Sequence, residues 1–124
     1  MSNKITLSTR FYKHLKEFMK DLIVVFPDDR DIKVISSTIN IASMDDEEYE
    51  LIYGFRDALL PLDVLITSRD DNLYKQDPSL YWKTGSNQYQ LFSKLNIYWD
   101  SLNETNRKIV WDYIQLIYTI AKQF

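Results

Sequence analysis

Residues 103–122, NETNRKIVWDYIQLIYTIAK, carry an almost continuous apolar helical pattern. Asn103 is a helix-capping residue, and Glu104 places a negative charge in the first turn, where the helix dipole favours it. From Ile109 to Ile120 nearly every side chain is apolar or aromatic. The polar residues form one narrow stripe of Asp112, Gln115, Thr119 and Lys122. Because such a helix has only a narrow polar face to expose to solvent, we predict that other helices surround it.

A second helical pattern lies near the start of the chain, where apolar residues recur at one-face spacing from Phe11 to Phe26. Ser8 or Thr9 is the expected N-cap. Pro27 should end this helix, because a residue before proline avoids the α region. The polar face of the helix carries a candidate basic patch, made of Arg10, Lys13, Lys16 and Lys20.

Further helices are expected between these two. Asp28 or Asp29 can cap a helix marked by three isoleucines, Ile32, Ile35 and Ile39. Residues 35–41 are rich enough in β-branched side chains for a strand, but no second strand pattern exists to pair with them. Ser43–Glu48 is the expected start of a third helix, which Pro61 should end, and residues 88–102 support another. These patterns predict one all-α domain, residues 1–124, as a compact bundle of five or six helices with a central apolar C-terminal helix.

Residues 67–88 form the irregular segment of this domain, with polar residues, Pro78 and Gly85. Loops of this length inside a compact domain are usually functional or poorly ordered. The candidate partner-contact residues are its aromatic side chains and the one that follows, Tyr74, Tyr81, Trp82 and Tyr89. The alternative, which we favour, is that these aromatics pack back onto the core.

Composition excludes several chemistries. The chain has no cysteine, two glycines and His14 as its one histidine, which argues against disulfides, Gly-rich phosphate loops and Cys/His metal sites. The acids of residues 45–50 lack the alternating ligands and central glycine of a calcium loop. We therefore expect no catalytic site, no cofactor and no metal site, and a protein that is not an enzyme.

Charge is unevenly distributed, with a net of +3 over residues 1–26, −8 over residues 27–77 and +2 over residues 78–124. An isoelectric point near 5.1 makes nucleic acid an unlikely partner, although the basic patch is the place where it would bind. No apolar run is long enough to span a bilayer, and no signal peptide is evident. We expect an intracellular protein that is not secreted.

Two adjacent segments carry a resemblance to a known group. Residues 92–100, FSKLNIYWD, are followed by residues 103–117, which begin with a short polar cap and continue into a Trp-x-Tyr-x-Gln-Leu pattern at Trp111, Tyr113, Gln115 and Leu116. This arrangement resembles short uncharacterised helical proteins of nucleocytoplasmic large DNA viruses. The resemblance implies an all-helical viral accessory or virion-associated protein, located in the host cytoplasm or the virion, and it transfers no functional residue.

These observations favour a non-enzymatic protein–protein interaction module that binds a viral or host protein or a second copy of itself. The alternative is a nucleic-acid-binding accessory factor that uses the basic face of the first helix.

Overall fold

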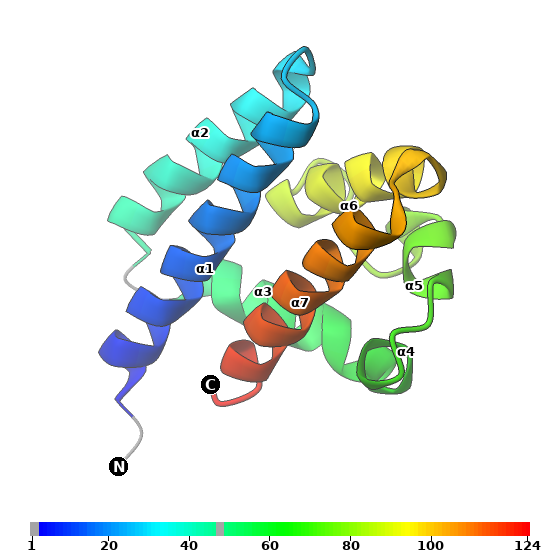
Figure 1. Ribbon diagram of the computed structural model, residues 1–124. Coiled ribbons are helices and arrows are strands. Elements are labelled where there is room, and N and C mark those ends of the chain that lie inside the picture. The colour runs from blue at the N-terminus through cyan, green and yellow to red at the C-terminus, as the bar shows by residue number, and fades with distance from the viewer. Residues whose placement is uncertain (1–2, 47–48) are drawn as a thin grey trace.

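The computed structural model describes residues 3–46 and 49–124, which form an all-α bundle, as the sequence predicts (Figure 1). Five helices have ten residues or more: α1 (Lys4–Val25), α2 (Arg30–Met44), α3 (Glu50–Leu59), α6 (Asn87–Tyr98) and α7 (Glu104–Ala121). Single turns complete the chain: η1 (Leu60–Leu62), α4 (Asp63–Thr67), α5 (Asn72–Lys75), η2 (Pro78–Leu80) and η3 (Trp99–Ser101). The described residues contain no strand.

The bundle is organised around α1 and α7. Helices α1 and α2 lie side by side and run in opposite directions, and α7 lies along another side of α1 (Figure 1). Helix α7 also packs against α3 and α4, while α6 packs against α2. The buried residues of α7 are Val110, Trp111, Ile114, Ile117, Tyr118, Ile120 and Ala121. The prediction of a central apolar C-terminal helix is therefore confirmed.

Helix α1 begins five or six residues earlier than predicted. The side chain of Asn3 accepts a hydrogen bond of 3.2 Å from the Thr6 backbone N–H and caps the helix. Ser8 and Thr9 lie inside the helix, and their hydroxyls donate to the Ile5 carbonyl at 2.9 Å. The predicted cap was wrong because a serine or threonine hydroxyl can bond to a carbonyl of the preceding turn as well as to an N-terminal amide.

Helix α2 follows the prediction closely. The Asp29 carboxylate accepts from the backbone N–H groups of Asp31, at 2.9 Å, and Ile32, at 3.3 Å. All three predicted core isoleucines are buried, so residues 35–41 are helix and not strand.

The junction before α3 differs from the predicted cap. Ser43 is still part of α2, and the left-handed residue Tyr49, with φ +56°, directly precedes α3. Asp46 nevertheless serves the new helix, because its carboxylate accepts from the Glu50 backbone N–H at 2.8 Å. The predicted capping residues at positions 47 and 48 lie outside the described residues.

The predicted helix ends farther along the chain agree with the structure. Helix α3 ends at Leu59, two residues before Pro61. Asn103 caps α7, since its side chain accepts from the Asn106 backbone N–H at 2.8 Å. None of the described helices has the length and apolar character needed to cross a membrane.

Candidate interaction surface

Two of the four aromatic residues proposed as partner contacts are core residues. Tyr74 is 1% exposed and Trp82 is 5% exposed. The Tyr74 ring stacks on Trp99 with centroids 4.0 Å apart, and Trp82 packs edge-on against Phe55 at 5.3 Å. These two are therefore not exposed contacts, and the favoured alternative of packing onto the core is confirmed for them, because large rings gain more from burial against one another than from exposure on a loop.

The other two candidates, Tyr81 and Tyr89, are half-buried and also pack against the core. The Tyr81 hydroxyl donates to the Leu73 carbonyl at 3.0 Å. Burial, assisted by the charge of Asp77, raises the pKa of Tyr81 to about 12. Tyr89 lines a surface groove described below. The irregular segment therefore supplies no exposed aromatic patch, and its rings extend the core.

The candidate basic patch lies on the surface of α1, with Lys16 half-buried and the other three cations exposed. Lys13 and Lys16 border a hollow of about 380 Å³ together with hydroxyl side chains and Asp46. The Tyr12 hydroxyl donates to the Asp46 carboxylate. Burial and this bond raise the pKa of Tyr12 well above its ordinary value. The Asp46 carboxylate therefore lies next to two of the lysines of the basic patch, in this hollow.

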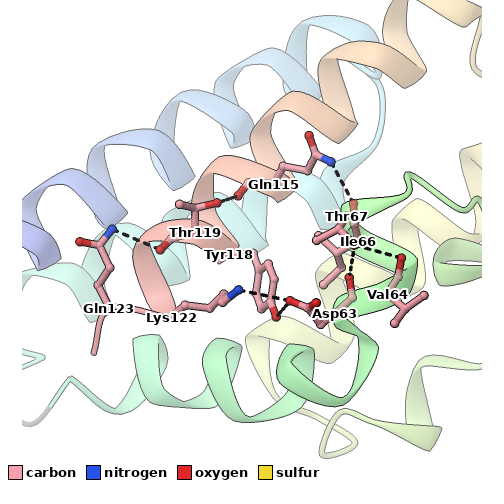
Figure 2. Close-up of polar contacts among 9 residues, drawn as sticks. All are labelled: Asp63, Val64, Ile66, Thr67, Gln115, Tyr118, Thr119, Lys122 and Gln123. Atoms are coloured by element: carbon pink, nitrogen blue, oxygen red, sulfur yellow. Dashed lines mark hydrogen bonds and ion pairs between the residues drawn. The ribbon is translucent and has the colours of Figure 1, made fainter.

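Two residues of the predicted polar stripe of α7, Gln115 and Lys122, bond to α4, whereas Thr119 donates to the Gln115 carbonyl of its own helix (Figure 2). The Tyr118 hydroxyl donates to Asp63 at 2.5 Å, and Lys122 Nζ lies 3.3 Å from the same carboxylate. These two bonds lower the pKa of Asp63 below its ordinary value. Gln115 Nε2 donates to the Ile66 carbonyl at 2.9 Å. Gln115, Tyr118 and Lys122 therefore hold α4 against α7.

Arg69, which follows α4, also bonds to α7. Its backbone has the left-handed conformation, with φ +52°. Its guanidinium donates to Gln115 Oε1 at 2.8 Å and to Asp112 at 2.6 Å. These polar groups are bonded to one another across two elements. Among the described residues, no three potential metal ligands lie together.

A second polar cluster joins α6 to the start of α2. Lys94 Nζ lies 3.0 Å from both Asp29 and Asp31, and the Tyr98 hydroxyl donates to Asp29. Burial alone would raise the pKa of Asp29, but the hydrogen bonds from Tyr98 and Lys94 outweigh it and hold the value at about 2. This cluster holds the first turn of α2 against α6, while Ile32, Ile35 and Ile39 face the core along the helix.

The outer face of α2 is exposed, and it carries three large apolar side chains among polar ones. Val34 is 59% exposed, Ile41 68% and Met44 82%. With Arg30 and Ser37, which are also exposed or partly exposed, they recur at alternating spacings of four and three residues. At 3.6 residues per turn this spacing aligns all five on one side of the helix. We call this row, Arg30, Val34, Ser37, Ile41 and Met44, the α2 outer stripe.

A groove of about 320 Å³ lies beside the stripe, between α2 and α6. It is lined by Asp31, Val34, Ile35, Tyr89, Gln90, Ser93 and Lys94. Val34 belongs to both the groove and the stripe, so the two features form one continuous surface.

A pattern in the sequence indicates the α2 outer stripe. The search for partner contacts in residues 67–88 did not take this pattern into account. Once Ile32, Ile35 and Ile39 are assigned to the core, Val34 and Ile41 remain seven residues apart on the opposite side of the helix. Two apolar residues at that spacing are typical of a second contact face.

An additional apolar groove, of about 270 Å³, lies between the end of α1 and the start of α7. Its lining includes Leu22, Val24, Leu102 and Ile109.

Comparison with protein-family models, with curated proteins and with solved structures finds no match for this chain.

Proposed function

We propose that this chain is a non-enzymatic protein–protein interaction module whose contact surface is the α2 outer stripe. One observation carries the proposal: three large apolar side chains are more than half exposed in a single row on a helix whose other face is already packed. The three lie at i, i+7 and i+10, and apolar side chains along one helix face are how amphipathic helices bind partner helices or grooves.

The residue types support this assignment. Ile41 and Val34 are stiff β-branched side chains, while Met44 is flexible and can adapt its shape to a partner. Ser37, in the middle of the row, is small and allows a partner backbone to approach closely. The groove next to Val34 adds a concave element to the convex row.

The resemblance of residues 92–117 to helical proteins of large DNA viruses supports a more specific proposal. It favours an accessory or virion-associated protein that acts in the host cytoplasm or in the virion, with a viral or host protein as partner.

A second candidate function is nucleic-acid binding through the basic face of α1. Arg10, Lys13 and Lys20 are exposed and form ion pairs with none of the other described residues. Binding to phosphates would then weaken steeply as salt is raised, and Lys13→Ala with Lys20→Ala would reduce the salt slope. Affinity for duplex DNA or RNA that is low and independent of these lysines would exclude this function.

The interaction module is tested by substituting the stripe. Ile41→Glu places a charge on an exposed helical position, so the fold should be retained. Val24→Glu is the matched control, because Val24 is also a strongly exposed aliphatic residue and lies at the α1–α7 groove. Tagged wild-type protein and both variants are used to capture proteins from a lysate of the source cells, and self-association is measured alongside.

We expect Ile41→Glu to abolish association with self or with a captured protein, and Val24→Glu to leave it intact. Equal association by all three proteins would contradict the assignment of the contact surface to α2.

A further inference from the structure

We propose that the α2 outer stripe binds the same stripe of a second copy of this chain, in antiparallel orientation, with Met44 of each copy entering the α2–α6 groove of the other. This inference rests on the proposed function, because it names the partner of the surface assigned there. The expected assembly is a symmetric dimer.

The spacing of the row suits a two-fold symmetric pairing. When two such helices run antiparallel and centre near residue 39, Val34 of one copy lies opposite Met44 of the other, and Ser37 lies opposite Ile41. Each contact then occurs twice, as a two-fold axis requires. The small side chain of Ser37 leaves room for the larger Ile41 that opposes it, which is how facing helix positions interdigitate.

Charges at the two ends of the row favour the antiparallel orientation. Arg30 lies at one end and Asp45 at the other, and neither is buried. Neither forms an ion pair with another described residue. Asp31, beside Arg30, is already paired with Lys94. An antiparallel pair brings each Arg30 near the Asp45 of the other copy, whereas a parallel pair would place Arg30 against Arg30. Antiparallel helix dipoles also attract.

The groove explains how the most exposed apolar side chain of the row is covered. Met44 is 82% exposed and lies at the last residue of α2. In the antiparallel arrangement it faces Val34, which forms part of the groove lining. A flexible thioether chain fits an irregular hollow better than a branched side chain does. The hollow is also partly apolar, because Ile35 and the Tyr89 ring line it.

The dimer should be weak and concentration-dependent. One pair of four-turn helices with flanking contacts is a small contact, and small interfaces are weak or transient, so we expect a dissociation constant on the order of tens of micromolar. Sedimentation equilibrium from about 5 µM to about 500 µM brackets this range. We expect the mean mass to rise from 14.9 kDa toward twice that value. A monomer over the whole range would overturn the proposal.

Orientation is tested by a charge exchange. Asp45→Lys should weaken the dimer at least fivefold, because it places two cations together at each end of the interface. Adding Arg30→Glu should restore the affinity, since the two charges have then exchanged places in every copy. Both changes put the new charge at the helix end whose dipole favours it, so the fold is retained. Weakening by the single variant without recovery in the double variant would overturn the antiparallel arrangement.

Register is tested by cross-linking, which the absence of native cysteine makes specific. Val34→Cys and Met44→Cys proteins are mixed and oxidised. We expect disulfide dimers in the mixture that exceed, by at least fivefold, those formed by either variant alone. Efficient cross-linking of Val34→Cys with itself would indicate parallel helices and overturn the proposal. If Val24→Cys forms disulfide dimers as efficiently as the mixture does, the cross-links reflect random collisions. This result would also overturn the proposal.

The outcomes separate this inference from the proposed function. A protein that stays monomeric but still captures another protein through Ile41 would refute the self-pairing and leave the interaction module intact. A dimer that Ile41→Glu does not weaken, or that Val24→Glu abolishes, would refute both the self-pairing and the assignment of the contact surface to α2.

Discussion

Lys94 Nζ lies 3.0 Å from the Asp29 carboxylate, and this contact joins the second turn of α6 to the N-cap of α2. Both side chains are largely buried, with Lys94 18% exposed and Asp29 8%. A pair at this depth is held in one geometry, and breaking it leaves an uncompensated charge. The contact therefore holds the N-terminal end of α2 against α6, in the orientation that its buried isoleucines favour.

The first prediction concerns acid stability. The pKa of Asp29 is about 2 in the folded chain, against an ordinary value of 3.8. Because the folded value is depressed, the stabilisation that Asp29 provides is present above pH 4 and is lost as the pH falls toward 2. We expect Asp29→Asn, which keeps a capping side chain, to lose less stability than wild type over this interval. Urea unfolding between pH 2 and pH 7 measures the difference, and parallel curves would contradict it.

The second prediction concerns the other partner of the pair. Lys94→Met keeps most of the aliphatic stem but removes the cation, and we expect it to lower the free energy of unfolding by about 2 kcal/mol. Lys33→Met is the control, because Lys33 is an exposed residue of α2 and its removal should change stability by less than about 0.5 kcal/mol. Equal effects of the two substitutions would show that Lys94 is not specifically needed. Unfolding is measured at low protein concentration, where the chain is monomeric.

The third prediction concerns the irregular segment. Trp82→Ala should lower the free energy of unfolding by about 3–5 kcal/mol, the usual cost of emptying the site of a buried aromatic ring. Leu80→Ala should change it by less than about 0.5 kcal/mol, since Leu80 is 73% exposed in the same segment. Chemical denaturation of the two variants tests the contrast. A small effect of Trp82→Ala would show that the Trp82 side chain is exposed and not part of the core.

The fourth prediction concerns a buried hydroxyl. The Tyr74 hydroxyl has no hydrogen-bond partner among the described residues. Burying an unpaired polar group costs free energy, so we expect Tyr74→Phe to leave stability unchanged or to raise it by up to about 1 kcal/mol. The Tyr98 hydroxyl donates to Asp29, so Tyr98→Phe should instead lower stability by about 1 kcal/mol. Thermal unfolding ranks the two variants, and a marked loss in Tyr74→Phe would reveal a bonded hydroxyl.

The fifth prediction concerns backbone strain at Arg69. Its φ of +52° lies in the left-handed region, where a side chain other than that of asparagine or aspartate is unfavourable. Arg69→Ala and Arg69→Gly both lose the bonds to Gln115 and Asp112. Glycine tolerates the backbone angle, so Arg69→Gly should be more stable than Arg69→Ala by about 1 kcal/mol. The opposite order, found by urea unfolding, would show that the turn relaxes once the guanidinium is absent.

The helices and most of their ends could be predicted because each has a local cause. The period of Ile32, Ile35 and Ile39 defines a buried helical face, and Asp29 and Asn103 are capping residues next to apolar patterns. The start of α1 was misplaced because Asn3 and Thr9 are both capable caps. Only the burial of Leu7 favours the earlier start, and that burial depends on packing.

The surface was harder to predict than the core. Between Thr67 and Gln88 the chain has no periodic pattern, so no local signal distinguishes a ring that contacts a partner from one that enters the core. The buried positions of Tyr74 and Trp82 depend on contacts with α3, α6 and η3, which are distant in sequence. The exposure of Val34 and Ile41 likewise depends on α2 lying at the edge of the bundle, a property of the whole arrangement.

The central position of α7 has a consequence for how the chain is made. Asp21 of α1 accepts a hydrogen bond from Tyr113 of α7, which lies 92 residues later in the sequence. A ribosome that adds about 5–20 residues per second needs roughly 5 to 20 s to cover that distance. From its own synthesis onward, each of α1 and α3 lacks the helix that covers it until α7 has been made. The domain therefore closes its core only when translation has passed Ile120, and chaperones that bind exposed apolar segments have those seconds in which to act.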